Sequence, residues 1–186
     1  MQKTLLCILC FILFGCSISS VKLPAEYSHQ FKRANKSKSI KNIEKCSFYL
    51  NEFEDARQSK SLGIVALTIV ESDVEKWALS ALNQYNIDNK NSVELPHVKV
   101  SLVKAYIHSM MTSMAANVVF KIEYPDTDKV LTKENETNSI VIKYVRGYEV
   151  NVNWNSGEDE ILSTLNKAMS NAIAKARNEL DQKLCT

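Results

Sequence analysis

The N-terminal apolar run constrains the fold of this chain more than any other feature of its sequence. It extends from Leu5 to Phe14 and follows a positive charge at Lys3. A run of ten residues matches the hydrophobic region of a signal peptide and is too short to cross a bilayer core of about 30 Å. We therefore predict that residues 1–15 are a leader and that the rest of the chain builds the fold.

The residues Leu13-Phe14-Gly15-Cys16 at the end of this run resemble a bacterial lipobox. In that motif the cysteine becomes the lipid-bearing first residue of the mature chain. Gly15 and Cys16 fit it, whereas Phe14 stands where a small residue is commoner. The alternative is an ordinary signal peptide that is cut elsewhere. We predict that Cys16 is lipidated and attaches the chain to a membrane.

Charge divides the remaining chain into two parts. Residues 17–45 carry seven basic and two acidic side chains, whereas residues 46–186 carry fifteen basic and nineteen acidic ones. This predicts a flexible basic tether over 16–45 and a single globular domain over 46–186. The basic side chains are either simply solvated or add attraction to anionic headgroups, on the order of 1 kcal/mol each. The mildly acidic domain argues against nucleic acid as a partner.

Two cysteines remain once the leader and the lipidation site are set aside. They are Cys46 and Cys185, one at each end of the predicted domain. An even number of cysteines in an exported chain favours a disulfide, and closing a loop of about 140 residues would stabilise the fold by up to about 5 kcal/mol. The alternative is a pair of free thiols. The bond requires that the two ends of the domain lie together.

Hydrophobic periodicity predicts the element order β-β-α-β-β-β-α. Strands are expected over 46–53, 63–70 and 139–154, and two more over 98–124 with a bend near 108–113. Within the range 139–154, Gly147 suggests a bulge or a bend. One helix follows a capping box at Ser72–Glu75, and a longer one follows Ser156. We predict an α+β fold in which an antiparallel sheet of about four to five strands is packed by two amphipathic helices. One face of that sheet is then solvated or covered by a partner.

The sequence contains no recognisable catalytic or metal-binding motif. His29, His97 and His108 are far apart and lack the i, i+4 spacing of a zinc helix. There is no GxSxG motif, and four glycines form no phosphate-binding loop. We therefore expect no metal, no cofactor and no enzymatic activity.

Two groups of side chains are candidates for ligand or partner contacts. Asp55 and Arg57 follow the first predicted strand and either contact a ligand or pair with each other in the turn. Tyr148 and Trp154 are either exposed aromatic anchors for a partner or part of the core.

Short motifs along the domain also point to a known group of proteins. They are Asp55-Ala56-Arg57, Leu62-Gly63, a helix with Trp77 and Leu82, then Gly147, Trp154 and a final helix that begins with acidic residues. This pattern resembles the YajG-like and ABC-transport-auxiliary bacterial lipoproteins over most of residues 46–184. The resemblance implies an α+β accessory or binding component on the periplasmic side of the outer membrane. It supplies no catalytic residues. Ser17 after the lipidated cysteine is similar to the arrangement that enteric bacteria sort to the outer membrane.

These inferences favour a lipid-anchored accessory module that binds an envelope protein through the sheet face or a strand edge. It predicts an exposed apolar patch on the domain. The alternative is a carrier of a lipid or small apolar ligand, which requires an enclosed pocket of roughly 300 Å³ or more. An enzyme would need convergent polar groups with perturbed pKa values in a cleft.

Overall fold

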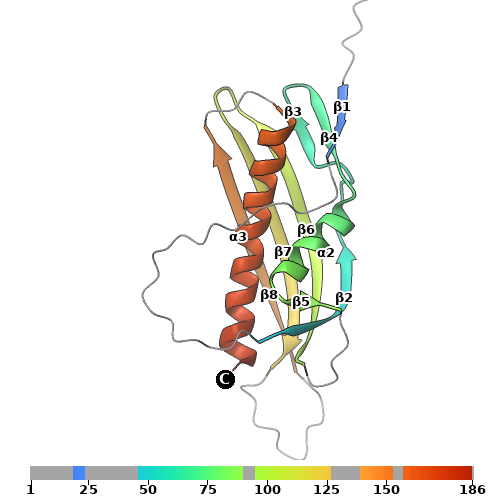
Figure 1. The fold of residues 1–186 in the computed structure, drawn as a ribbon, viewed down its shortest axis with the longest axis vertical. Coiled ribbons are helices and arrows are strands. Elements are labelled where there is room, and N and C mark those ends of the chain that lie inside the picture. Colours follow the sequence, from blue (N-terminus) through green and yellow to red (C-terminus); the bar gives the residue numbers. More distant parts are fainter. Residues whose placement is uncertain (1–18, 24–45, 90–94, 127–138, 153–156, 186) are drawn as a thin grey trace, which may run out of the picture.

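The computed structural model describes residues 19–23, 46–89, 95–126, 139–152 and 157–185. Cys16, Trp154, the predicted leader and most of the predicted tether lie outside these ranges. The elements are β1 (Ser19–Lys22), β2 (Phe48–Asp55), β3 (Gly63–Val65), β4 (Thr68–Glu71), α2 (Val74–Gln84), β5 (Ile87–Asp88), β6 (His97–Ser109), β7 (Met114–Pro125), β8 (Ile140–Asn151) and α3 (Glu158–Leu184). They form a curled sheet with two helices (Figure 1), so the predicted α+β class is confirmed.

The sheet is mixed rather than antiparallel. The described residues contribute eight strands to it in the order β1-β4-β3-β6-β2-β5, with β7 beside β6 and β8 beside β7. β6, β7 and β8 form the predicted antiparallel meander, with the first turn at 110–113. β2 runs parallel to β6 because the chain between them passes through α2, which returns it to the same end of the sheet. The prediction of an antiparallel sheet was therefore wrong for this pair of strands, because side-chain alternation carries no information about strand direction.

Two short strands replace the single apolar run predicted over 63–70. β3 and β4 form a hairpin whose turn residues, Ala66 and Leu67, have φ angles of 46° and 65°. β5 follows α2 directly and pairs with the start of β2, and Ile87 is buried there.

The predicted tether is ordered where the structure describes it. β1 pairs in parallel with β4 over its four residues, and Leu23 just after it is buried. Its backbone groups are satisfied at the edge of β4, while Val21 packs against the core. The expectation of a flexible segment over 16–45 is therefore wrong for residues 19–23.

The helices pack on one face of the sheet and against each other. Trp77 of α2 donates from Nε1 to Oδ1 of Asn166 in α3 at 2.8 Å, and both side chains are buried. α2 begins one residue later than predicted, because Asp73 rather than Ser72 caps it and accepts from the Lys76 N–H at 3.2 Å. The predicted cap of α3, Ser156, lies outside the described residues, and Gly157 occupies the cap position.

Gly147 brings α3 close to β8. The β7–β8 pairing runs without a register shift, so Gly147 marks no bulge. A Cβ atom at this position would lie 1.8 Å from the Ala168 carbonyl oxygen and 2.5 Å from the Ala172 nitrogen. The absent side chain therefore sets how closely the helix approaches the strand.

We expect Gly147→Ala to lower the free energy of unfolding by about 1–3 kcal/mol, because the added methyl group must push α3 away from the sheet. Urea denaturation would measure this change. The matched control is Tyr144→Thr, also on β8 but exposed on the opposite face, which should change stability by less than about 0.5 kcal/mol. Equal effects from the two substitutions would contradict the close approach.

Candidate functional site: the open face and edge of β8

The two faces of β8 have different surroundings. Val141 and Val145 pack against the core under α3, and Gly147 lies on the same side. Successive side chains of a strand point to opposite faces, so the even-numbered residues lie on the face away from the helices. Five of them are large, apolar or aromatic, and 38–65% exposed: Ile140, Ile142, Tyr144, Tyr148 and Val150. We call these five residues the β8 stripe.

The free edge of β8 is covered along part of its length. Within the described residues β8 pairs only with β7. The Arg146 carbonyl accepts from Lys175 Nζ at 2.7 Å, and the Tyr148 carbonyl accepts from Asn171 Nδ2 at 3.2 Å. The described contacts place no similar cover over residues 140–144. Among the described residues, the start of β8 therefore combines an exposed apolar face with a backbone edge that pairs with no other strand.

A charged zone borders the β8 stripe on the same sheet face. Tyr144 pairs with Lys121 of β7, and Ile142 pairs with Glu123. The Glu123 carboxylate raises the pKa of Lys121 above its ordinary value by accepting a hydrogen bond from it. Farther across the sheet, Lys99 and Glu52 form an ion pair at 2.7 Å, and Glu52 likewise raises the pKa of Lys99. These charges are paired with each other, so they form a polar border beside the stripe.

Tyr148 is held in place by a neighbouring arginine. Arg146 donates from Nε to Oδ1 of the buried Asn117 at 2.6 Å, and its guanidinium lies 5.4 Å from the centre of the Tyr148 ring. This contact orients the ring without covering it, because Tyr148 remains 45% exposed. Of the two predicted aromatic contacts, Tyr148 thus lies on the open face, whereas Trp154 is outside the described residues.

Asp55 and Arg57 pair with each other at the end of β2. Arg57 is buried and donates to both carboxylate oxygens of Asp55, from Nε at 2.8 Å and from Nη2 at 2.9 Å. These hydrogen bonds hold the pKa of Asp55 below its ordinary value. The pair is separated from β8 by β6 and β7, so the fold does not bring it together with Tyr148.

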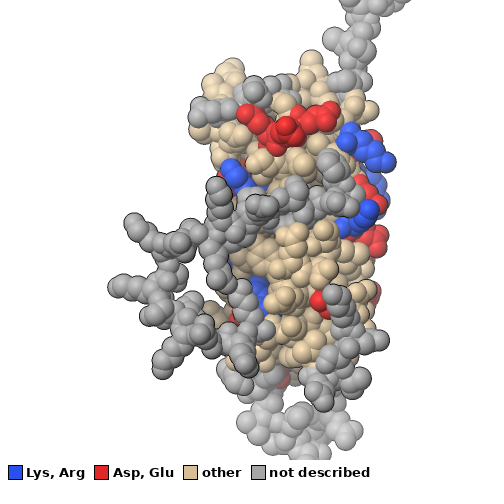
Figure 2. All heavy atoms as spheres, in the orientation of Figure 1, with Lys and Arg blue, Asp and Glu red and all other residues tan. Residues whose placement is uncertain are grey.

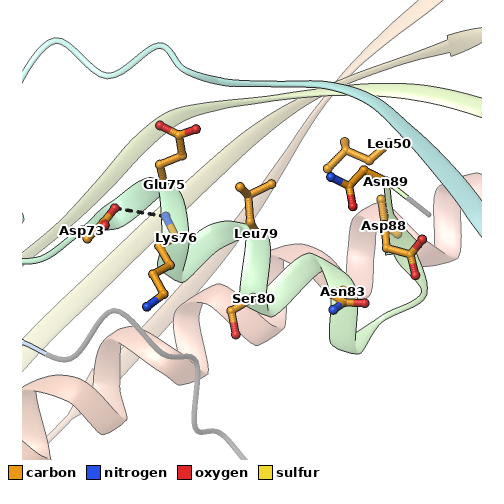
Figure 3. Close-up of a pocket in the computed structure, with 10 residues that line it drawn as sticks. Leu50, Asp73, Glu75, Lys76, Leu79, Ser80, Asn83, Asp88 and Asn89 are labelled. Carbon is orange, nitrogen blue, oxygen red and sulfur yellow. Dashed lines mark hydrogen bonds between the residues drawn. The ribbon is translucent and has the colours of Figure 1, made fainter. Parts of the chain in front are cut away.

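Two hollows open on the surface of the domain. One of about 530 Å³ lies beside α2 and is rimmed by polar and charged side chains that include Asp73, Lys76 and Asp88 (Figure 3). The other, of about 480 Å³, lies between the end of β2 and β6, with Arg57 and Lys104 in its lining. Between the sheet and the helices, by contrast, buried side chains pack into one hydrophobic cluster.

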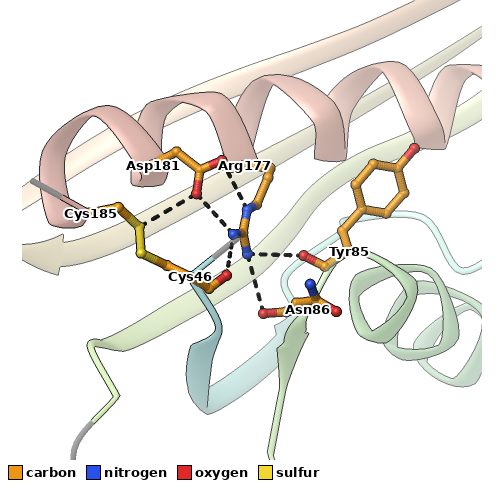
Figure 4. The surroundings of a disulfide bond; sticks show 6 residues. All are labelled: Cys46, Tyr85, Asn86, Arg177, Asp181 and Cys185. Atoms are coloured by element: carbon orange, nitrogen blue, oxygen red, sulfur yellow. Dashed lines mark hydrogen bonds and ion pairs between the residues drawn. A yellow bond between two sulfur atoms is a disulfide. The ribbon is translucent and has the colours of Figure 1, made fainter. Parts of the chain in front are cut away.

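Cys46 and Cys185 lie together at one end of α3, with their Cα atoms 6.2 Å apart and their sulfur atoms at bonding distance. Arg177 lies beside them (Figure 4). Its guanidinium donates to the carbonyl oxygens of Cys46, Tyr85 (3.1 Å) and Asn86 (3.4 Å). Its charge is paired with Asp181, and it stacks over Phe48 at 4.4 Å.

Arg177 was missed by the sequence analysis. The available signal was its position: it falls on the buried side of α3, four residues after Ile173 and three before Leu180. A cation in an apolar stripe must find acceptors, and here it joins α3 to the start of β2 and the end of α2.

The described histidines sit beside tyrosines, His97 with its ring 4.8 Å from Tyr49 and His108 with its ring 5.8 Å from Tyr106. His29 lies outside the described residues. Within those ranges no three or more His, Cys, Asp or Glu side chains gather in a way that could hold a metal ion. In the same part of the chain, no helix has the length and apolar character needed to span a membrane.

No family model matches the sequence, and no curated protein matches it either. A comparison with solved structures finds two that resemble part of the chain. One, described only as an uncharacterized protein, is 7% identical with a TM-score of 0.47, over 87% of this chain and 97% of that chain. The other is protein XCC0632 from Xanthomonas campestris, of family model DUF330, at 7% identity and a TM-score of 0.40, over 76% of this chain and 92% of that chain.

Asp55 makes stability depend on pH. A carboxylate whose pKa is lowered in the fold stabilises it above the unfolded pKa of about 3.9, and this contribution is lost as pH falls through the lowered folded value. We expect Asp55→Asn to destabilise the domain by about 1–3 kcal/mol at pH 7, because the buried guanidinium of Arg57 loses its carboxylate partner. The difference from wild type should shrink as the pH falls below about 4.

Chemical denaturation across this pH range would measure the difference. Lys60→Gln is the control, since Lys60 is an exposed second partner of Asp55 at 3.6 Å and should contribute less than about 0.5 kcal/mol. A destabilisation by Asp55→Asn that is constant from pH 7 to pH 3 would rule out the ion pair as its cause.

We expect Arg177→Lys to lower the free energy of unfolding by about 2–3 kcal/mol, because an ammonium group cannot reach the three carbonyl oxygens and Asp181 at once. Thermal unfolding under non-reducing conditions would measure it. Lys167→Gln, which removes an exposed cation of α3 from a 3.6 Å pair with Glu149, should change stability by less than about 1 kcal/mol. Full stability of Arg177→Lys would show that charge alone suffices.

Proposed function

We propose that this protein is a lipid-anchored lipoprotein of the bacterial envelope that acts as a non-catalytic interaction module on the periplasmic side of the outer membrane. Cys16 would carry the anchor, and the β8 stripe would bind a protein partner. The observation that carries the proposal is the row of exposed apolar and aromatic side chains on β8. The resemblance to YajG-like and ABC-transport-auxiliary lipoproteins supports the same assignment.

The β8 stripe has the composition of a binding surface. It extends over ten residue steps, or about 34 Å of extended chain. Tyrosine and arginine are enriched where partners bury surface, and Tyr144, Arg146 and Tyr148 alternate along this face. Isolated exposed apolar residues need no explanation, but a continuous row on one strand does. Covering it would remove from water side chains that the fold itself leaves exposed.

The open edge at residues 140–144 suggests how a partner would bind. An extended segment that adds a strand there would gain main-chain hydrogen bonds, and its side chains would extend the sheet face next to the stripe. The ion pairs of the charged zone would then form the rim of the interface, as polar residues do around the apolar centre of known interfaces.

The carrier alternative has less support. The two hollows are large enough for a small ligand, but both are open to solvent and rimmed by charged side chains. A small-molecule site normally buries most of the ligand surface among apolar side chains. An apolar ligand would remain largely exposed in either hollow.

The origin of the pKa shifts among the described ionisable groups supports a non-catalytic role. Those whose pKa clearly departs from the ordinary value are Asp55, Lys99 and Lys121. Each shift arises from a hydrogen-bonded ion pair with a neighbouring side chain, rather than from convergence of polar groups in a cleft.

We expect a photo-crosslinking amino acid at position 144 to capture a defined envelope protein in intact cells, because Tyr144 is at the centre of the stripe. The same amino acid at Lys76, exposed on α2, should not capture it. Ile142→Asp should reduce capture at least tenfold, since a carboxylate in an apolar interface is desolvated without a partner. Mass spectrometry of the crosslinked species would identify the partner.

The anchor is tested by comparing wild type with Cys16→Ser. Mass spectrometry of the wild-type N-terminus should find a lipid on Cys16, and the variant should leave the membrane fraction. Equal capture from positions 144 and 76 would refute the stripe as the binding surface. An N-terminus cut elsewhere would refute the anchor.

A further inference from the structure

We propose that two hairpin tips of the domain insert into the membrane that holds the lipid anchor, so that the domain stands on the bilayer in one orientation. The tip patch consists of Leu67 in the β3–β4 turn and of Met110 and Met111 in the β6–β7 turn. This inference rests on the proposed lipidation of Cys16. It adds a second membrane contact made by the folded domain itself.

The tip patch is exposed, and a hydrogen bond joins the two hairpins that carry it. Met111 is fully exposed, Leu67 is 72% exposed and Met110 is 44% exposed. The Ala66 N–H donates to Ser109 Oγ at 3.3 Å, so the β3–β4 turn is tied to the end of β6. Figure 1 shows both turns at the same end of the molecule. Each turn thus presents apolar side chains beyond the last paired residues of its strands.

The chain leaves the domain toward its N-terminus at this same end. Ser19, the first residue of β1, pairs with Thr68, which directly follows Leu67. Only three peptide steps separate Cys16 from Ser19, and an extended chain covers at most about 3.6 Å per residue. A lipid on Cys16 would therefore start within about 11 Å of the beginning of β1. The ordered β1 leaves no room for the long reach expected of a tether, so the tip patch would meet the membrane surface.

The β3–β4 turn is chemically unsuited to a solvated hairpin. Ala66 and Leu67 both have positive φ angles, 46° and 65°. Such two-residue turns strongly prefer Asn-Gly, because residues with a Cβ atom are strained there. This turn instead holds a large apolar side chain in an unfavourable backbone conformation and exposes it. Contact with the boundary between lipid headgroups and acyl chains would offset both features.

Acidic residues near the tip set the depth of insertion. The first turn of α3 carries Glu158, Asp159 and Glu160, and this turn lies at the tip end of the molecule. Figure 2 shows acidic side chains gathered near that end. Carboxylates must remain hydrated, so only the hairpin tips would enter the bilayer. The contact is therefore apolar, and we expect it to form on zwitterionic vesicles without anionic lipid.

The test uses the mature lipidated protein in phosphatidylcholine vesicles. Met111→Cys is labelled with an environment-sensitive fluorophore, and nitroxide groups on the lipid acyl chains serve as quenchers. The control label is at Ile140→Cys. Ile140 is also exposed, but it lies at the end of β8 that is far from the β6–β7 turn. We expect quenching at position 111 to be several-fold stronger than at position 140. Equal quenching at the two positions would overturn the inference.

A second variant separates membrane contact from folding. Leu67→Gly removes the apolar side chain and relieves the strained φ angle, so thermal stability should be unchanged or raised. We expect the ratio of inserted to free tip to fall about tenfold, the effect of returning one such side chain to water. Unchanged quenching at position 111 in this variant would overturn the inference. A fluorophore at position 111 that is shielded from water but not quenched by the lipid would also overturn it, because another protein surface would then cover the tip.

The two measurements distinguish a missing tip contact from a missing lipid anchor. A chain that carries its lipid and floats with vesicles, but whose label at position 111 stays in water, overturns only the tip contact. A chain whose mature N-terminus lacks the lipid overturns the anchor, and the tip inference with it.

Discussion

The packing of α3 on the sheet is the contact on which the rest of this structure depends. The helix runs along β7 and β8 and approaches closely because Gly147 has no side chain. The core is filled from that side, by a stripe that includes Ile161, Leu165 and Ile173. A sheet covered by helices on one face leaves the other face to solvent or to a partner. The surface that we propose for binding is therefore a direct consequence of where the helix lies.

The ends of the domain are held together by a cysteine pair and a network of polar contacts. Cys46 and Cys185 meet at the C-terminal end of α3, and Arg177 donates to the backbone where β2 begins and α2 ends. The cation is buried, yet it is satisfied by carbonyl oxygens and by Asp181. Such a network ties α3 to both neighbouring elements, and so keeps β8 and its exposed face in a fixed position relative to the rest of the sheet.

The two proposed surfaces have a consistent geometry. β8 runs along the long axis of the molecule, and its last residues lie at the end where the hairpin tips and the start of β1 are found. A domain standing on the tips would hold the β8 stripe roughly upright above the membrane. A partner in the same membrane would then meet the stripe from the side, with the start of β8 farthest from the bilayer.

The fold class, the amphipathic faces of both helices and the antiparallel meander of β6, β7 and β8 could all be predicted from the order of residues along the chain. Local periodicity encodes these features, because the spacing of apolar residues dictates which side of each element is buried. It also indicated Tyr148 as a contact candidate and Cys46 and Cys185 as a possible pair.

Three features depend on the folded chain and could not be predicted from local patterns: the parallel pairing of β2 with β6, the ordering of β1 and the role of Arg177. Each depends on residues far apart in the chain: β1 is ordered by β4, and Arg177 by carbonyl oxygens of β2 and the end of α2. The exposure of the β8 stripe was decided in the same way. Both faces of β8 carry apolar residues, so its pattern alone could not indicate which face α3 would cover.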